Sequence, residues 1–106
     1  MKARKVRAKS GPTLTVNPKT YSIHPAGHVH APKKSERGLV NFHATAPCTI
    51  IFKNSKVFGH GSARLAKGAN KRSIQIERGH TIVHIKGWPV ARSLGAATSP
   101  NDIIVP

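Results

Sequence analysis

The run Cys48-Thr-Ile-Ile-Phe-Lys53 has the strongest β-strand character in this chain of 106 residues. β-Branched and aromatic side chains dominate it, and such side chains pack well on a pleated, half-buried surface. Because side chains alternate along a strand, Ile50 and Phe52 are expected to face the core. Ala46-Pro47 punctuates the chain just before the run, so we predict a short strand here rather than part of a helix.

Short runs of the same kind recur on both sides of this strand, separated by turn-forming residues. The expected strands are Leu14 to Val16, Tyr21 to Ile23, His28 to His30, Gly38 to His43, Lys71 to Glu77, His80 to Lys86 and Asp102 to Val105. Residues 54–70 are expected to form a loop that Val57, Phe58 and Leu65 anchor in the core. Seven or eight short strands with turns between them predict an all-β fold, a small Greek-key β-sandwich.

Two consecutive strands are expected to pair directly with each other. Arg78-Gly79 is a two-residue connection between them, which is typical of a β-hairpin. The strand before this connection should turn Ile74 and Ile76 inward. The strand after it is apolar at three of its central positions, which predicts burial on both of its faces.

The charge balance of the chain is extreme. It carries 18 Lys and Arg residues against 3 acidic ones, which gives a formal net charge of +15. Such a charge repels itself in the folded protein, and a polyanion relieves that cost. Paired-carboxylate hydrolysis and the acid-rich metal sites of many nucleases need more Asp and Glu than this chain has. The composition therefore favours a non-enzymatic protein with an anionic partner, nucleic acid foremost.

The basic residues fall into three groups along the chain. Residues 1–11 are rich in like charges and poor in apolar residues, so we expect a disordered basic tail ahead of one domain at residues 12–106. The other two groups lie in loops or at strand starts, from which long side chains can reach phosphates. The candidate anion-binding residues are Lys2, Arg4, Lys5, Arg7, Lys9, Lys33, Lys34, Arg37, Arg64, Lys67, Lys71 and Arg72.

Recognition of individual bases is not expected. Phosphate contacts carry no sequence information of their own. Stacking on bases needs exposed aromatic side chains, and only Tyr21 and Trp88 are candidates, because the three phenylalanines fit the core pattern. The predicted binding therefore has little sequence specificity.

Several strand sequences follow one another in a suggestive order: Gly38-Leu-Val-Asn-Phe, Cys48-Thr-Ile-Ile-Phe, Phe58-Gly59, Ile74-Gln-Ile, Thr81-Ile-Val-His-Ile and Asp102-Ile-Ile-Val. Over residues 12–106 this order resembles bacterial cupredoxin-like sandwich domains, which implies a cupredoxin-like or Ig-like sandwich. The resemblance would also imply copper. A blue-copper site needs two imidazoles, a thiolate and usually an axial Met. Here Cys48 lies mid-chain and the only methionine is Met1, so that ligand pattern is absent.

The chain has seven histidines, which raises the question of another metal site. His28 and His30 would share one face of a strand, and so would His80 and His84. Paired imidazoles suit zinc or copper, although no carboxylate lies near either pair in the sequence. The alternative to polyanion binding is therefore a cupredoxin-like protein that binds copper or zinc. The histidines could instead lie on a polar surface without binding a metal. A third interpretation of the whole chain is a structural subunit of a larger assembly.

The remaining features concern redox chemistry and location. Cys48 is the only cysteine, so it cannot form an intramolecular disulfide, and at the start of an apolar strand it is expected to be inert. The chain has no run of about 18 apolar residues, so no membrane span is predicted. In a signal peptide an apolar core follows the basic start, but in this chain Ser10, Gly11 and Pro12 follow it. This favours a cytoplasmic protein, unless a leader has been removed and the protein is exported.

Overall fold

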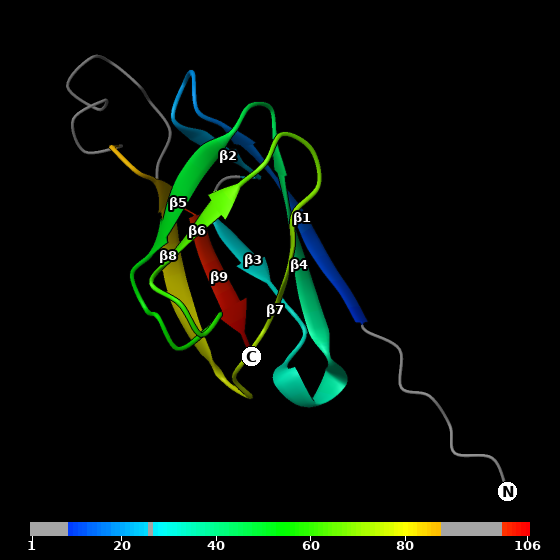
Figure 1. The fold of residues 1–106 in the computed structure, drawn as a ribbon. Coiled ribbons are helices and arrows are strands. Elements are labelled where there is room, and N and C mark those ends of the chain that lie inside the picture. The colour runs from blue at the N-terminus through cyan, green and yellow to red at the C-terminus, as the bar shows by residue number, and fades with distance from the viewer. Residues whose placement is uncertain (1–8, 26, 88–100) are drawn as a thin grey trace, which may run out of the picture.

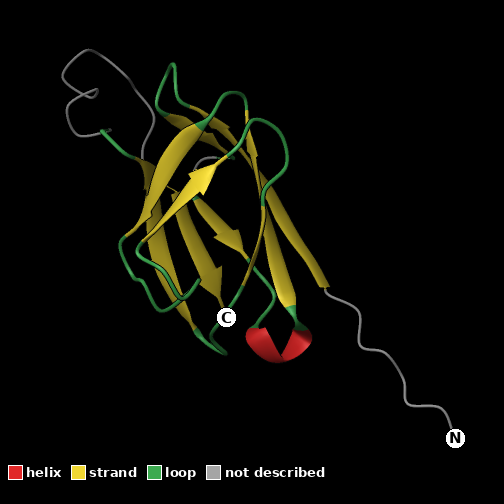
Figure 2. Ribbon diagram, viewed as in Figure 1, coloured by secondary structure: helices red, strands yellow, loops and turns green. Residues whose placement is uncertain are grey.

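Figure 1 shows the fold in a computed structural model that describes residues 9–25, 27–87 and 101–106. These residues form nine strands and one short 3-10 turn, η1 (Lys34–Glu36), so the predicted all-β fold is confirmed. Strands and loops alternate throughout this part of the chain (Figure 2). The strands are β1 (Lys9–Asn17), β2 (Ser22–His24), β3 (His28–His30), β4 (Gly38–Ala44), β5 (Cys48–Phe52), β6 (Ser62–Leu65), β7 (Lys71–Ser73), β8 (Gly79–Ile85) and β9 (Asn101–Val105).

The strands build two sheets that face each other across the core (Figure 1). One sheet has the strand order β2-β1-β4-β7 and the other has the order β3-β9-β8-β5-β6. Both sheets are mixed, because β1 pairs with β4 in parallel and β3 pairs with β9 in parallel. The chain crosses between the sheets after β2, β3, β4, β6 and β7, so neighbours in the sequence are often not neighbours in a sheet.

Three phenylalanines occupy the space between the sheets. The rings of Phe52 and Phe58 stack with centroids 4.6 Å apart, and Phe42 lies 5.6 Å from Phe58 and 5.9 Å from Phe52. All three are buried, as predicted, and each buried side chain of this size stabilises the fold by about 1.5–3 kcal/mol. The aliphatic residues predicted to face the core are also buried: Ile50, Val57, Leu65 and Ile74.

The strand predicted from Lys71 to Glu77 is wrong in its second half. β7 ends at Ser73, and the backbone then changes partner, because the Gln75 amide donates to the Val57 carbonyl at 2.8 Å. The predicted hairpin at Arg78-Gly79 is also wrong, since β7 and β8 belong to different sheets. The alternation of apolar residues continues through this segment, but alternation does not say which strand supplies the hydrogen bonds.

The loop predicted at residues 54–70 contains a strand that the sequence did not reveal. β6 pairs with β5 in an antiparallel register that sets Cys48 opposite Leu65 and Ile51 opposite Ser62. Leu65 is the only fully buried residue of β6, so the strand shows almost no apolar alternation. An edge strand of this kind is defined by backbone pairing rather than by burial.

β8 differs from the prediction of burial on both faces. Thr81, Val83 and Ile85 are buried, whereas Ile82 and His84 are only half-buried on the opposite, outer face. β8 lies in the middle of its sheet, but nothing in the described residues covers that outer face to the same depth as the core. The prediction of burial on both faces was wrong because it took the apolar Ile82 as a sign of a covered outer face.

β1 begins at Lys9, three residues ahead of the predicted domain boundary at residue 12. Lys9 pairs with Gly38 and Ser10 pairs with Leu39 in the parallel register with β4. Lys9 to Gly11 therefore belong to the sheet and not to the predicted tail, of which residues 1–8 lie outside the described residues. In the part of the chain that the structure describes, no helix is long and apolar enough to cross a membrane.

Candidate anion-binding edge and histidine face

Four predicted anion-binding residues lie where the free edges of the two sheets meet. β6 is the last strand of one sheet and β7 is the last strand of the other. The guanidinium of Arg72 joins them, because its Nη2 donates to the backbone carbonyl of Arg64 at 3.1 Å. Lys67 and Lys71 lie on the connection between these strands and at the start of β7, and both are exposed. All four cations thus lie on the two edge strands or on the connection between them.

The connection between β6 and β7 is held by one asparagine side chain. The Asn70 amide nitrogen donates to the carbonyls of Phe42, Ala66 and Gly68 at 2.8–3.1 Å, and its oxygen accepts from the Ala66 amide at 3.0 Å. Gly68 adopts φ +101°, a backbone conformation that other residues rarely reach. The tight loop presents Lys67 to solvent on a fixed backbone.

Two further cations extend this edge along β7. The exposed Lys34 and Arg37 line a hollow of about 410 Å³ together with Ser73 and Leu39. Lys71 lines a smaller hollow of about 90 Å³, which Leu39 also borders. Two groups that are far apart in the sequence therefore both lie beside β7. We call the six residues the basic edge: Lys34, Arg37, Arg64, Lys67, Lys71 and Arg72.

Gly38 fixes the turn that carries the first of these two groups. A Cβ at this position would lie 2.0 Å from the carbonyl oxygen of Pro32, so only glycine allows the chain to approach so closely. The Gly38 amide donates to the Lys33 carbonyl at 3.1 Å and closes the turn around η1. Arg37 itself has a left-handed backbone conformation with φ 54° at the end of η1, and its amide donates to the Lys34 carbonyl at 2.8 Å.

The three carboxylates of the chain all have partners. Glu36 pairs with Lys9 at 2.9 Å, and the hydrogen bond from the Lys9 side chain lowers the pKa of the Glu36 carboxyl. Glu77 accepts hydrogen bonds from the amide and the hydroxyl of Ser35, both at 2.7 Å. Asp102 contacts two histidines. Three carboxylates engaged in this way cannot balance 18 cations, and the basic edge keeps its positive character.

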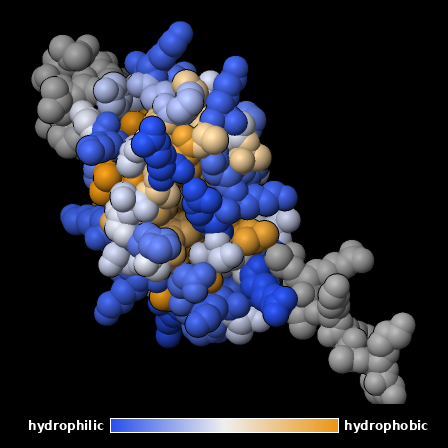
Figure 3. All heavy atoms as spheres, in the orientation of Figure 1, coloured by the Kyte–Doolittle hydropathy of each residue, from blue (hydrophilic) through white to orange (hydrophobic). Residues whose placement is uncertain are grey.

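Figure 3 shows the molecule in the orientation of Figure 1, where hydrophilic side chains cover most of the visible surface and hydrophobic ones show between them.

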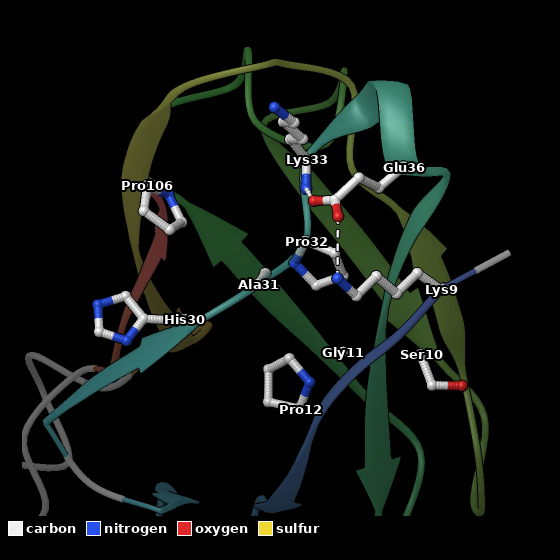
Figure 4. A pocket seen from close by; sticks show the side chains of 10 residues that line it. All are labelled: Lys9, Ser10, Gly11, Pro12, His30, Ala31, Pro32, Lys33, Glu36 and Pro106. Atoms are coloured by element: carbon white, nitrogen blue, oxygen red, sulfur yellow. Dashed lines mark hydrogen bonds and ion pairs between the residues drawn. The ribbon is translucent and has the colours of Figure 1, made fainter.

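Figure 4 shows a separate hollow of about 490 Å³ around the start of β1. Pro12, Pro32 and Pro106 line it, and the pair between Lys9 and Glu36 spans one side. The predicted anion-binding residue Lys33 also lines this hollow.

The four histidines proposed as metal ligands share one surface, the outer face of the second sheet. The register of β3, β9 and β8 places His28, Asp102 and Ile82 in one row across the strands. The next row holds His30, Ile104 and His80, while His84 lies opposite Ile51 of β5. We call this surface the histidine face: His28, His30, His80 and His84 with Asp102 among them.

Asp102 lies between two of these histidines and contacts both. Its Oδ1 is 3.0 Å from Nδ1 of His80, and its Oδ2 is 3.3 Å from Nδ1 of His28. The side chain of Asp102 is 22 % exposed, against 63 % for His80 and 71 % for His28. The carboxylate thus forms the base of the arrangement, and the imidazoles extend from it towards solvent.

The arrangement of the histidine face bears on the predicted metal site. No group of three or more His, Cys, Asp or Glu side chains in the described part of the chain is arranged to hold a metal ion. β3 and β8 are separated by β9, so His28 and His80 reach Asp102 from opposite sides instead of converging on one point. The predicted metal ligands are brought to one face but not to one centre.

Sequence reasoning missed the role of Asp102. It noted that no carboxylate lies near the histidine pairs in the sequence, and His80 is indeed 22 residues from Asp102. The signal that could have revealed the contact is the alternation in the final strand, which predicts that Asp102 and Ile104 share one face. Only the pairing of β9 between β3 and β8 then sets Asp102 beside both histidines.

The other predicted contact residues have mixed outcomes. Lys2, Arg4, Lys5 and Arg7 lie outside the described residues, and so does Trp88. Tyr21 is half-buried and packs against the core, which leaves less of its ring for stacking on a base. Cys48 is half-buried at the start of β5, and burial raises the pKa of its thiol, so it is a poor nucleophile at neutral pH.

Comparison of the chain with protein-family profiles, with curated proteins and with solved structures gives no match. A functional assignment therefore depends on the charge and geometry described above. The similarity to cupredoxin-like domains stays a prediction from apolar patterns in the sequence.

Proposed function

We propose that this protein binds a polyanion, most readily nucleic acid, through phosphate contacts along the basic edge and without catalysing a reaction there. The observation that carries this proposal is the gathering of two sequence groups, Lys34 and Arg37 with Arg64 to Arg72, around the edge strand β7. If the cations served only to keep the protein soluble, they could be spread evenly over its surface and would not need to gather in this way. A row of phosphates is the partner that matches a row of cations.

The chemistry of the basic edge favours contact with the phosphate backbone over recognition of bases. Its members are lysines and arginines, and the hollows between them are bordered by small or aliphatic residues such as Ser73 and Leu39. Stacking platforms for bases need exposed aromatic rings. The phenylalanines are committed to the core, so binding with little sequence specificity follows.

The test is a titration of the full chain with fluorescent duplex DNA and single-stranded RNA at several salt concentrations. Each phosphate that is neutralised releases counterions, so the logarithm of the affinity should fall linearly with the logarithm of the salt concentration, by about 0.9 per contact for duplex DNA. Absence of binding at low salt would end the proposal. Binding that does not respond to salt would overturn its electrostatic basis.

The contribution of the N-terminal basic residues is tested separately by deleting residues 2–8. This deletion leaves Lys9 and the rest of β1 in place and removes Lys2, Arg4, Lys5 and Arg7. We expect weaker binding with a smaller salt dependence. Unchanged affinity would confine the contacts to the folded domain.

A second candidate function is binding of copper or zinc, as a cupredoxin-like protein without the type-1 ligand pattern. The observation in its favour is that His28, His30, His80 and His84 all lie on one face of one sheet. Native mass spectrometry after exposure to Cu²⁺ or Zn²⁺ tests it, with the four histidines changed to Ala as the control. Stoichiometric metal that disappears in the variant would support this function.

A further inference from the structure

The histidine face continues into the basic edge through one arginine. β6 pairs with β5 so that Arg64 lies opposite Thr49, and β5 pairs with β8 so that Ile51 lies opposite His84. Residues opposite each other on neighbouring strands share a face of the sheet, and so do residues two apart on one strand. Arg64, a member of the basic edge, therefore lies on the same outer face as the histidines.

The imidazole rings of this face are exposed, and two of them are held in place. The side chains of His28 and His80 are 71 % and 63 % exposed, and their Nδ1 atoms lie 3.3 and 3.0 Å from the carboxylate of Asp102. His30, on the same strand as His28, is also exposed. Imidazole is among the side-chain rings that stack on nucleobases. A ring that is already oriented loses less side-chain entropy when it stacks.

Apolar surface lies between the rings. Ile104 is half-buried and stands between His30 and His80 in one row across the strands. His80 and Ile104 also border a hollow of about 410 Å³, which Arg78 lines as well. A hollow of this size accepts a small planar group, and its combination of ring, aliphatic side chain and guanidinium suits a nucleobase or its phosphate.

The charge on this sheet favours an anionic occupant. Asp102 is the only carboxylate in the five strands of the sheet, and it already contacts two imidazoles. The exposed Lys53 and Lys86 directly follow β5 and β8. The backbone amide of Lys86 donates to the Thr49 carbonyl at 2.9 Å, which places this lysine one strand away from Arg64. Cations therefore lie around the rings, where the phosphates of a bound strand would need them.

We propose that the histidine face stacks the unpaired bases of a single-stranded nucleic acid whose phosphates follow Arg64 and the rest of the basic edge. This inference deepens the proposed binding of a polyanion and rests on it. Stacking is possible with every base, because every base has a flat aromatic face. The binding therefore keeps its low sequence specificity and gains a preference for single strands.

The spacing of the rings is the reason for this preference. His28 and His30 are two residues apart, about 7 Å along the strand, while β9 separates His28 from His80 by about 10 Å across the sheet. Bases in a duplex stack on one another at a spacing of about 3.4 Å and leave no face open to a separate ring. A single strand can splay its bases and set one beside each ring.

The test compares two single strands of about 15 nucleotides that have the same number of phosphates, one of thymidines and one without bases. Fluorescence anisotropy at low salt measures the affinity of the full chain for each. We expect the thymidine strand to bind about 10-fold more tightly, because only its bases can stack. The basic edge contributes equally to both complexes, since their phosphates are the same.

The rings are tested by two replacements at the same positions. The double variant His28→Gln with His80→Gln removes two rings and should lower the affinity for the thymidine strand by about 5-fold or more, with little change for the strand without bases. The double variant His28→Phe with His80→Phe keeps flat rings and should restore the preference. His43→Gln, which changes an exposed histidine on the other sheet, is the matched control and should bind as the parent protein does.

The outcomes separate this inference from the proposed function. Equal affinity of the parent protein for the two strands overturns stacking on the histidine face and leaves phosphate binding by the basic edge standing. Absence of binding to both strands at low salt removes the proposed function itself. A Phe variant that binds no better than the Gln variant also overturns stacking, because the rings would then be dispensable. Circular dichroism verifies the fold of each variant, and Tyr replaces Phe if the Phe variant does not fold.

Discussion

The basic edge and the histidine face place positive charge on the same domain in two different ways. At the basic edge the cations are lysines and arginines, which keep their charge at every physiological pH. On the histidine face the groups are imidazoles, which are cationic only when protonated, and a carboxylate lies between two of them at 3.0 and 3.3 Å. The edge is formed by strands at the borders of both sheets, whereas the face belongs to three neighbouring strands of one sheet.

The difference shows what each surface is suited to do. Permanent cations attract phosphate from a distance, and salt screens that attraction. Imidazoles anchored on a carboxylate have a defined orientation, which suits stacking at short range more than long-range attraction. Four predictions test whether the two surfaces are as different as their chemistry implies.

The largest effect is expected from removing the basic edge around β6 and β7. Changing Arg64, Lys67, Lys71 and Arg72 to Gln together should weaken binding of duplex DNA at low salt by about 100-fold and reduce the salt slope by about 3. The double variant His28→Gln with His80→Gln should bind DNA within about 3-fold of the parent protein. Fluorescence anisotropy measures both. If the double variant lost more affinity than the quadruple one, the roles of the two surfaces would be reversed.

The next prediction concerns a substitution that should distort the backbone turn at one end of the basic edge. Gly38→Ala sets a methyl group 2.0 Å from the Pro32 carbonyl oxygen, so the turn that carries Lys34 and Arg37 must shift. We expect the free energy of unfolding to fall by about 1–3 kcal/mol, measured by urea denaturation. Gly61→Ala is the control, because its nearest neighbour, the Ser55 Cβ, is at 3.9 Å. Equal stability of the two variants would contradict the close approach at Gly38.

A smaller effect is expected when the charge of the edge is kept and its geometry is changed. Arg72→Lys retains a cation but loses the guanidinium that donates to the Arg64 carbonyl at 3.1 Å. Binding of DNA should weaken by less than about 3-fold, since counterion release depends on charge. Lys71→Arg serves as the reference for a change between the two cations. A loss as large as that of the quadruple variant would show that the bridge between the sheets, and not charge, controls binding.

The smallest effect concerns pH and the histidine face. Burial lowers the pKa of His84 from its ordinary value of 6.5, so the unfolded chain binds this proton more readily than the folded protein does. Stability should therefore decrease as the pH falls through about 6.5, and the loss should level off below the folded pKa. His84→Asn should show a shallower decrease between pH 7 and 5 in thermal unfolding. A steeper decrease would mean that His84 is stabilised in its charged form.

Local patterns predicted much of the fold. The alternation in the run from Cys48 to Lys53 placed Ile50 and Phe52 in the core, and His28 to His30 formed the short strand expected of it. The same patterns failed at Ile82, which is half-buried on the outer face, whereas Ile76 packs against the core as predicted but is only half-buried. Alternation reports which residues share a face, but the depth of burial depends on what covers that face.

The candidate sites were predictable only in part. The two groups of basic residues and the four histidines were visible in the sequence, because composition and spacing expose them directly. Their arrangement was not visible, since β6 and β7 meet across the border of two sheets and β9 inserts between β3 and β8. Asp102 is the clearest case, as its contacts with His28 and His80 join three separate strands.

The amino-acid sequence was enough to predict an all-β domain and a core of phenylalanine and aliphatic side chains, and it fixes a net charge of +15. Folding was needed to bring Lys34 and Arg37 beside β7 and to place Asp102 between two imidazoles. The physical reason is that side-chain alternation is a property of each strand, whereas the choice of strand partners minimises the exposed apolar surface of the whole chain.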